Sequence, residues 1–289
     1  MRKPIIDMRC RPAMLHPFYG GTPGTMEHRF VVHLNHRVGS RDPEHFMRVQ
    51  TLGDLVEEIH GAGITRSVVL GRAMPGVRIP NDQVADIMVQ YPETFVGVGA
   101  VDPQDGGEQA AITAVDRAVN ILGLKGINLD PGFLQNPLKP NDPSLYPIYY
   151  RCQELDVPVF LMSGPIVGPT IDYTHPAYVG EVAARFPDLK IVCAHGFYPF
   201  VSEIIGVAFK HENVYVCPDM YLFLPGAHPY VEAANGFMQD QFLFGTAYPF
   251  RPLEQTVEDF LHSGFRDAVL DKILYQNAAR VLELAVEPK

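Results

Sequence analysis

The strongest constraint on the fold is a repeated alternation between short apolar runs and longer amphipathic stretches. Eight runs have the length of strands, namely residues 5–9, 66–71, 95–101, 125–129, 157–162, 190–195, 213–217 and 241–245. They are apolar along nearly their whole length and rich in β-branched residues. Strands of this kind are covered on both faces, which is typical of a parallel sheet.

Helix start signals separate these runs. Amphipathic stretches follow Asn81, Asp102-Pro103, Asp142-Pro143 and His175-Pro176, and such residues favour the first turn of a helix. A strand and a helix repeated eight times predict a (β/α)8 barrel, with a doubly wound open sheet as the alternative. The 289 residues suit one barrel, so we expect a single domain over residues 1–289.

Residues 12–50 interrupt this alternation of strand and helix patterns. Between Pro12 and Arg41 there is no periodic pattern, and the stretch contains Gly20-Gly21, Pro23-Gly24 and several histidines without the spacing of a metal site. A long segment after the first strand of a barrel lies at the carboxyl ends of the strands, where barrel active sites form. We therefore expect an insertion or lid over this mouth.

Composition excludes several classes of protein. The net charge is −10 and the basic residues are scattered, which argues against a nucleic-acid surface. No apolar run has the roughly 18 residues of a membrane span, and the N-terminus has no apolar signal stretch, so we expect a cytoplasmic protein. Reduced, packed thiols are expected for the four cysteines, which are Cys10, Cys152, Cys193 and Cys217.

Polar side chains gather where the predicted strands end. They include three arginines, one histidine, two acids, an amide and two tyrosines: Arg9, Arg11, Arg72, His195, Asp130, Asp219, Asn128, Tyr221 and Tyr248. Each alone is compatible with an ordinary ion pair, turn or helix cap. Together they would meet at one mouth, and charged groups cluster at a cost unless a ligand or a network compensates them.

Four stretches carry a resemblance to a known family. "FPDLKIVCAHGFYPF", "FLFGTAYPF", "GVGAVDPQD" and "LDVPVFLMSG" resemble the amidohydrolase-2 family, which includes aminocarboxymuconate semialdehyde decarboxylase, related decarboxylases and some lactonases. The resemblance implies the barrel fold. It also implies a divalent metal held by a His-x-His pair after strand one, a histidine after strand five and an aspartate after strand eight, with a further histidine in Ala-His-Gly as the acid/base.

The metal ligands implied by this resemblance are replaced in the chain. The His-x-His pair reads Arg9-Cys10-Arg11, the histidine after strand five reads Met162, and the aspartate after strand eight reads Ala247. Arginine is always protonated and cannot coordinate a cation, a thioether suits zinc poorly, and alanine has no ligand atom. Only His195 is retained, so we predict a member without metal or other cofactor.

The two arginines indicate an anionic ligand. Arg9 and Arg11 are two residues apart on a strand and should face the same side. At 6–7 Å and an effective dielectric near 20 their repulsion costs roughly 2–3 kcal/mol, which an anion would offset. A guanidinium fork binds a carboxylate in bidentate geometry, so these residues are candidates for holding a small carboxylate-bearing substrate.

Roles for the other residues follow. His195 is the candidate acid/base and Asp219 the candidate to orient it. Further candidate substrate contacts are Arg72, Asn128, Tyr221 and Tyr248.

The favoured function is a metal-independent, lactonase-like hydrolase acting on a cyclic or aromatic-derived acid. The alternatives are a metal-independent carboxy-lyase or other C–C lyase, and a binding barrel without catalysis. We expect no nucleic-acid or membrane partner. The apolar stretch 221–225 favours a homodimer interface or a lid.

Overall fold

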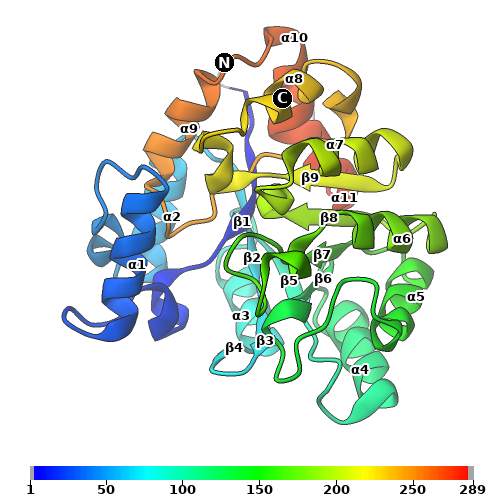
Figure 1. Cartoon of the computed structure of the whole chain (residues 1–289). Helices are drawn as coiled ribbons and strands as arrows, with labels where there is room; N and C mark the ends of the chain where they lie inside the picture. The colour runs from blue at the N-terminus through cyan, green and yellow to red at the C-terminus, as the bar shows by residue number, and fades with distance from the viewer. Residues whose placement is uncertain (1–2, 286–289) are drawn as a thin grey trace.

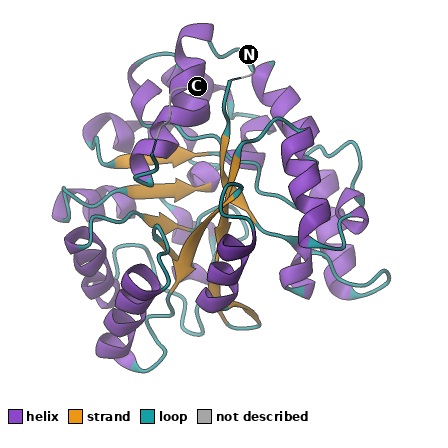
Figure 2. Cartoon of the chain, turned by 180° about the vertical axis from the view of Figure 1, so that it is seen from behind, coloured by secondary structure: helices purple, strands orange, loops and turns teal. Residues whose placement is uncertain are grey.

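A computed structural model describes residues 3–285 of the chain. Seven strands form one sheet in chain order, and every neighbouring pair is parallel. The strands lie at the centre of the molecule and helices surround them (Figures 1 and 2). They are β1 (Ile6–Cys10), β2 (Arg66–Leu70), β5 (Phe95–Ala100), β6 (Ile127–Leu129), β7 (Val159–Leu161), β8 (Ile191–Ala194) and β9 (Val214–Cys217).

The eighth predicted strand closes the sheet without forming a regular strand. On one side, the backbone N–H of Val216 donates to the carbonyl of Gln241 at 2.8 Å. On the other, the N–H of Met8 donates to the carbonyl of Phe244 at 3.0 Å. Residues 241–248 thus join β9 to β1, and the open-sheet alternative is wrong. The predicted single-domain (β/α)8 barrel is confirmed, with an irregular segment in the eighth strand position.

Helices connect successive strands. They are α2 (Leu52–Gly61), α3 (Asn81–Gln90), α4 (Gly107–Asp116), α5 (Tyr146–Glu154), α6 (Ala177–Arg185), α7 (Val201–Lys210), α8 (His228–Ala234), α9 (Leu253–Leu261), α10 (Asp267–Asp271) and α11 (Asn277–Val281). The four start signals found in the sequence precede or begin α3, α4, α5 and α6. A small hairpin of β3 (Arg72–Met74) and β4 (Val77–Ile79) follows β2. Within residues 3–285 no helix has the length and apolar character that crossing a bilayer requires.

The segment 12–50 is more ordered than its sequence suggested. It contains the twelve-residue helix α1 (Met26–Arg37), capped by the Thr25 hydroxyl, and short 3₁₀ turns at Ala13–Leu15, Pro17–Tyr19 and His45–Arg48. The sequence shows no periodic pattern in this segment, and the helix α1 was therefore not predicted. The buried residues of α1 are His28, Val31, Leu34 and Asn35, and since two of these four are polar, the helix has no clear apolar stripe in its sequence.

An extra residue in β1 sets the direction of the two arginines. Ile6 pairs with Arg66, but Cys10 pairs with Val69, so one more residue lies on β1 than on β2 between these points. Ile6 and Met8 pack in the apolar interior of the barrel, whereas Cys10 packs in the outer layer against the helices. A bulge changes the alternation of side chains. Arg9 and Arg11 consequently face the barrel axis above Met8.

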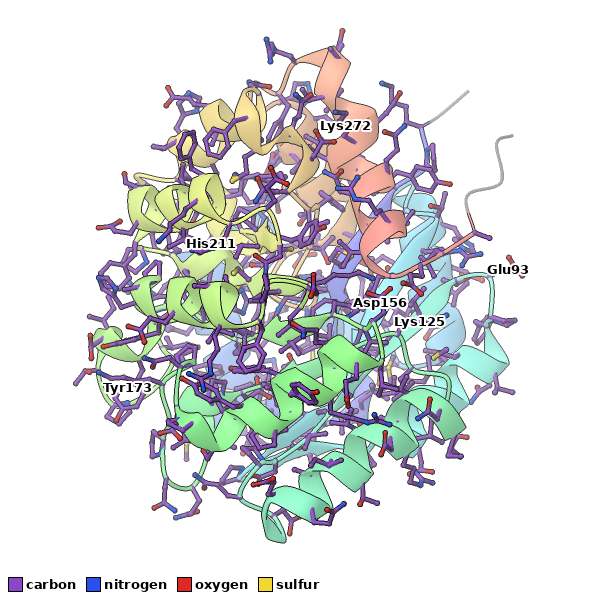
Figure 3. The ribbon with its side chains drawn as sticks, turned by 90° about the vertical axis from the view of Figure 1, so that its right-hand side faces the viewer. Glu93, Lys125, Asp156, Tyr173, His211 and Lys272 are labelled. Atoms are coloured by element: carbon purple, nitrogen blue, oxygen red, sulfur yellow. The ribbon has the colours of Figure 1, made fainter. Side chains whose placement is uncertain are left out.

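The two ends of the barrel lie on opposite sides of the molecule. In Figure 3, Glu93, which precedes β5, lies at the opposite edge from Tyr173, which belongs to the segment after β7. The C-terminal helix α11 packs its apolar residues against the interior at the amino-terminal end of the strands. The carboxyl ends of the strands carry the polar residues, as in other barrels of this type.

Candidate active site

Arg9 is buried and only partly compensated by its neighbours. Its Nη2 donates to Sδ of Met162 at 2.7 Å, and its Nε lies 3.6 Å from Oδ2 of Asp219. The side chain is 2% exposed, and no described group accepts a hydrogen bond from Nε or Nη1. Burial and the charge of Arg11 lower the pKa of Arg9 to about 9. A buried guanidinium with free N–H groups is a strong donor site for an anion.

The guanidinium group of Arg11 has no polar partner among the described residues. All three of its guanidinium nitrogens are buried without an acceptor. The guanidinium carbon lies 5.3 Å from the ring centroid of Tyr19 and 5.9 Å from that of Phe250. Aromatic faces stabilise such a cation, but they accept no conventional hydrogen bond. Leaving several buried donors unsatisfied costs free energy, so Arg11 is a candidate for binding an anion.

His195 and Asp219 form a hydrogen-bonded pair beside Arg9. Nδ1 of His195 lies 2.7 Å from Oδ1 of Asp219, and the backbone N–H of His195 donates to Oδ2 at 3.2 Å. Burial raises the pKa of Asp219 to about 7, against the opposing effect of Arg9 and Arg11. Burial, followed by the charges of Arg9, Arg11 and Arg72, holds the pKa of His195 well below its usual range.

The pair defines what the imidazole can do. A neutral His195 that donates its Nδ1 proton to the Asp219 carboxylate leaves Nε2 as a proton acceptor. No described residue is hydrogen-bonded to Nε2. The arrangement is that of a general base whose tautomer is fixed by a carboxylate.

Arg72 belongs to a second ion pair at the mouth. Its Nε lies 3.0 Å from Oδ2 of Asp130, and Nδ2 of Asn128 donates to the same oxygen at 3.0 Å. Nη2 of Arg72 donates to Sδ of Met74 at 2.9 Å. Oδ1 of Asn128 and Oδ1 of Asp130 are buried without a partner among the described residues. The charge of Arg72 is therefore largely compensated, unlike that of Arg11.

The two predicted tyrosines lie in different places. The ring of Tyr221 packs edge-on against His195, with centroids 5.1 Å apart, and stacks on Tyr198. The ring of Tyr248 instead packs against His45, with centroids 5.6 Å apart. The backbone carbonyl of Tyr248 accepts a hydrogen bond from the N–H of Arg11 at 3.0 Å, but among the described residues no hydrogen bond or ring contact joins the Tyr248 side chain to His195 or to the guanidinium groups. The structure thus brings Tyr221 to the cluster and leaves Tyr248 outside it.

The stretch 221–225 is not the exposed apolar segment that the sequence suggested. Residues 219–223 form a 3₁₀ turn that directs Tyr221 and Leu222 into the core, where they are 3% and 7% exposed. Phe223 and Leu224 are half-buried and Pro225 is exposed, so only the end of the stretch is open to solvent, and an interface or a lid there stays a prediction.

Two features of the site were not apparent in the sequence. The first is Tyr19, whose hydroxyl is buried without a partner among the described residues while its ring contacts Arg11. It comes from the 12–50 segment, where no local pattern distinguishes it. The second is the link between Asp7 and Thr246, whose N–H and hydroxyl both donate to the carboxylate at 2.7 Å. This link holds β1 to the closing segment directly beneath the arginines.

The backbone is strained at three of the strand ends. His195, Asp219 and Ala247 have φ values of 63°, 44° and 56°. Residues other than glycine adopt this region rarely and at a cost of about 1–3 kcal/mol, and such residues concentrate at functional sites. All three follow the strand positions from which the mouth is built.

The residues present do not fit the divalent metal that the family resemblance implies. The positions of three ligands hold Arg9, Arg11 and Met162, and the first and last of these contact each other instead of leaving lone pairs for a cation. Ala247 offers no donor atom. Within residues 3–285, no three His, Cys, Asp or Glu side chains converge as a possible metal site. Three guanidinium groups would also repel a dication.

The fold and the site together define a (β/α)8-barrel protein with a buried, positively charged mouth. The amidohydrolase family model matches residues 38–284 of the chain. The chain therefore belongs to the amidohydrolase family.

Two curated proteins and one solved structure are among the similar proteins. A 2-amino-3-carboxymuconate-6-semialdehyde decarboxylase from Dictyostelium discoideum is 31% identical over 244 residues, which is 71% of this chain and 65% of that protein. A 2-keto-4-carboxy-3-hexenedioate hydratase from a Sphingobium species is 31% identical over 142 residues, 43% of this chain and 41% of that protein. The matches span less than two thirds of either curated relative.

The solved structure is an uncharacterised TIM-barrel protein from Bordetella bronchiseptica. It superimposes with a TM-score of 0.89 at 34% identity, and the match covers 97% of this chain and 99% of that chain. The barrel is therefore shared over nearly the whole length, including the part of the 12–50 segment that precedes the family match.

Proposed function

We propose that the protein is a metal-independent carboxy-lyase acting on a small carboxylate-bearing substrate. The observation that carries the proposal is the placement of buried, unpaired guanidinium groups beside the His195–Asp219 pair. Arg9 and Arg11 supply positive charge where the resemblance implies a metal ion. They would hold the substrate carboxylate and stabilise negative charge that develops during reaction.

The relatives favour a lyase over the hydrolase expected from the sequence. The two curated proteins are named as a decarboxylase and a hydratase, and both names describe carboxylated compounds. Removing a carboxylate and adding water to a double bond both need an anion-binding group and one residue that moves a proton. The site offers these two elements, so the relatives and the geometry support the same class.

The proposed step is balanced as follows. The bond between the substrate carbon and its carboxylate breaks, and CO2 leaves. The bonding electron pair moves into a conjugated carbonyl or ring, whose oxygen becomes negative and is stabilised by a free N–H group of an arginine. Nε2 of a protonated His195 then gives its proton to the carbon. The substrate anion favours this protonation because it offsets the arginine charges that lower the pKa of His195.

The hydrolase remains a second candidate because of one observation. In the absence of a bound anion, burial and the three arginines keep His195 neutral, and Asp219 orients it with Nε2 free. That is the state of a general base that would activate water against a lactone carbonyl. The candidates differ in product, since opening a lactone adds water and releases no CO2.

The test uses purified, chelator-treated protein and a panel of carboxyl-¹³C-labelled muconate semialdehydes and hydroxybenzoates, with lactones in parallel. The proposal predicts ¹³CO2 from at least one labelled acid and loss of that activity in His195→Asn. Opening of a lactone with no ¹³CO2 from any acid would favour the hydrolase. A cytoplasmic location and a homodimer also stay proposals, and solution scattering at micromolar concentration tests the dimer.

A further inference from the structure

Positive charge is unevenly compensated at the mouth of the barrel. Arg72 has a carboxylate partner, Asp130, at 3.0 Å. Arg9 has only a 3.6 Å contact with Asp219, whose other oxygen is hydrogen-bonded to His195. Arg11 has no acidic partner within the described residues. Two separate guanidinium groups thus lack a full counter-charge, and one monocarboxylate cannot engage both forks in bidentate geometry.

The surroundings of Arg11 differ from those of Arg9. Arg9 lies beside Asp219, the partner of His195, and so belongs to the reacting end of the site. Arg11 is enclosed by the rings of Tyr19 and Phe250. Tyr19 is 1% exposed, and its hydroxyl has no hydrogen-bond partner among the described residues. A hydroxyl and a guanidinium fork, both buried and unpaired, form a donor set for one further carboxylate.

We propose that Arg11 and Tyr19 form a second anion subsite and that the substrate is a small dicarboxylate. This inference rests on the proposed function: the carboxylate that is lost lies at Arg9 and His195, and Arg11 holds the one that stays. Arg9 and Arg11 are two residues apart on a strand, so their Cα atoms are about 6–7 Å apart. The two carboxylates are therefore separated by a short chain or by one ring. Tyr19 makes the 12–50 segment part of substrate selection.

The experiment measures binding rather than turnover. Isophthalate and its monomethyl ester are titrated by calorimetry into wild-type protein, Arg11→Met and Tyr19→Phe. The ester retains the ring and one carboxylate but lacks the second negative charge. Arg78→Met, which removes an exposed arginine paired with Asp105, is the matched control.

Wild type is expected to bind isophthalate at least tenfold more tightly than the ester, a difference of one decade in Kd. Arg11→Met should reduce the preference for isophthalate over the ester to within about threefold. Tyr19→Phe should reduce the same preference by a smaller factor, because the two residues would bind the same carboxylate. Arg78→Met should keep it. Equal binding of diacid and ester by wild type, no binding of isophthalate, or an unchanged preference in Arg11→Met would each overturn the inference.

Two further readouts keep the outcomes distinct. Arg11→Lys retains the charge but not the fork, so it should recover part of the preference if Arg11→Met folds poorly, and thermal melting reports folding in both. Release of ¹³CO2 from a labelled dicarboxylate with the same kcat and KM in wild type and Arg11→Met would overturn the second subsite and leave the carboxy-lyase proposal intact. An Arg11-dependent preference for the diacid without CO2 release from any acid would support the second subsite and overturn the carboxy-lyase proposal.

Discussion

Nη2 of Arg9 lies 2.7 Å from Sδ of Met162, and both residues occupy positions where the family resemblance implies metal ligands. The thioether is a weak acceptor for an N–H group. The contact nevertheless orients the guanidinium, because Nη2 points at the sulfur while Nε and Nη1 have no described acceptor. The two replacements therefore depend on each other: one supplies the charge and the other positions it.

Met162→Leu tests this dependence. The substitution conserves volume, so it should change the free energy of unfolding by less than about 1.5 kcal/mol. It removes the acceptor for Nη2, and we expect the Kd for a carboxylate such as isophthalate to rise by about 3–10-fold, equivalent to roughly 1 kcal/mol. Calorimetric titration measures the effect. Unchanged affinity would show that the sulfur does not position Arg9.

Arg11→Met should stabilise the protein. The wild-type side chain is a buried cation without a polar partner in the described structure. Replacing a buried charge by an apolar group of similar size is neutral or stabilising by about 1–4 kcal/mol. Urea unfolding at neutral pH measures the change. A large loss of stability would mean that Arg11 has a structural role.

Arg251→Met is the matched control for that experiment. Arg251 is equally buried, but it donates to the carbonyl of Val38 at 2.6 Å and pairs with Asp259. Its removal leaves a carboxylate and a carbonyl without their donor, so this variant should be destabilised by about 1–3 kcal/mol. Opposite signs for the two buried arginines distinguish an unpaired functional charge from a structural one.

Asp7 should make stability fall as pH rises. Burial raises the pKa of its carboxyl from 3.8 to about 6 in the folded protein. Between these values the folded state binds more protons than the unfolded state, so the free energy of unfolding decreases with increasing pH. The difference of about two pKa units corresponds to roughly 3 kcal/mol.

Asp7→Asn isolates this contribution because the asparagine does not titrate. The stability of wild type relative to Asp7→Asn should fall by up to roughly 3 kcal/mol between pH 4 and pH 7. His195 has the opposite sign, since its lowered folded pKa favours the folded state as pH rises, but this contribution is common to both proteins. A difference that does not change with pH would show that the Asp7 pKa is not raised.

Asp219→Asn tests the orientation of His195. An asparagine at this position retains the shape but no longer accepts the Nδ1 proton as a carboxylate does. With a substrate found by the labelled-acid panel, kcat should fall by about 10²–10⁴-fold with little change in KM, as for loss of an acid/base group. His195→Asn should have an effect of the same order, and the double variant should not be much worse. Additive losses would indicate that the two residues act independently.

The sequence predicted the parts of the site that depend on local pattern. Regular strands place residues such as His195 and Asp219 at the same end of a barrel, so their meeting follows from the order of strands. Tyr248 could not be placed in this way, because Ala247 has a φ of 56° and the strand alternation ends before it. Tyr19 and the Arg9–Met162 contact are long-range contacts, and nothing in their local sequence marks them.

The direction of Arg9 and Arg11 has a less obvious cause. Simple alternation correctly predicts that they share a face, but it does not say which face, since Met8 is also interior. The bulge in β1 decides this. The bulge lies next to Asp7. The Asp7 carboxylate accepts hydrogen bonds from the backbone N–H of Arg9 at 3.0 Å and from the backbone N–H and the hydroxyl of Thr246.

The central claim is that this site binds an anion where the family resemblance implies a cation. It is tested most directly by calorimetric titration of chelator-treated protein with zinc chloride and, separately, with isophthalate. We predict binding of one isophthalate per chain, which Arg9→Met and Arg11→Met weaken by at least tenfold, and no stoichiometric binding of zinc that depends on His195. One zinc per chain that is lost in His195→Asn, together with no binding of isophthalate, would contradict the account.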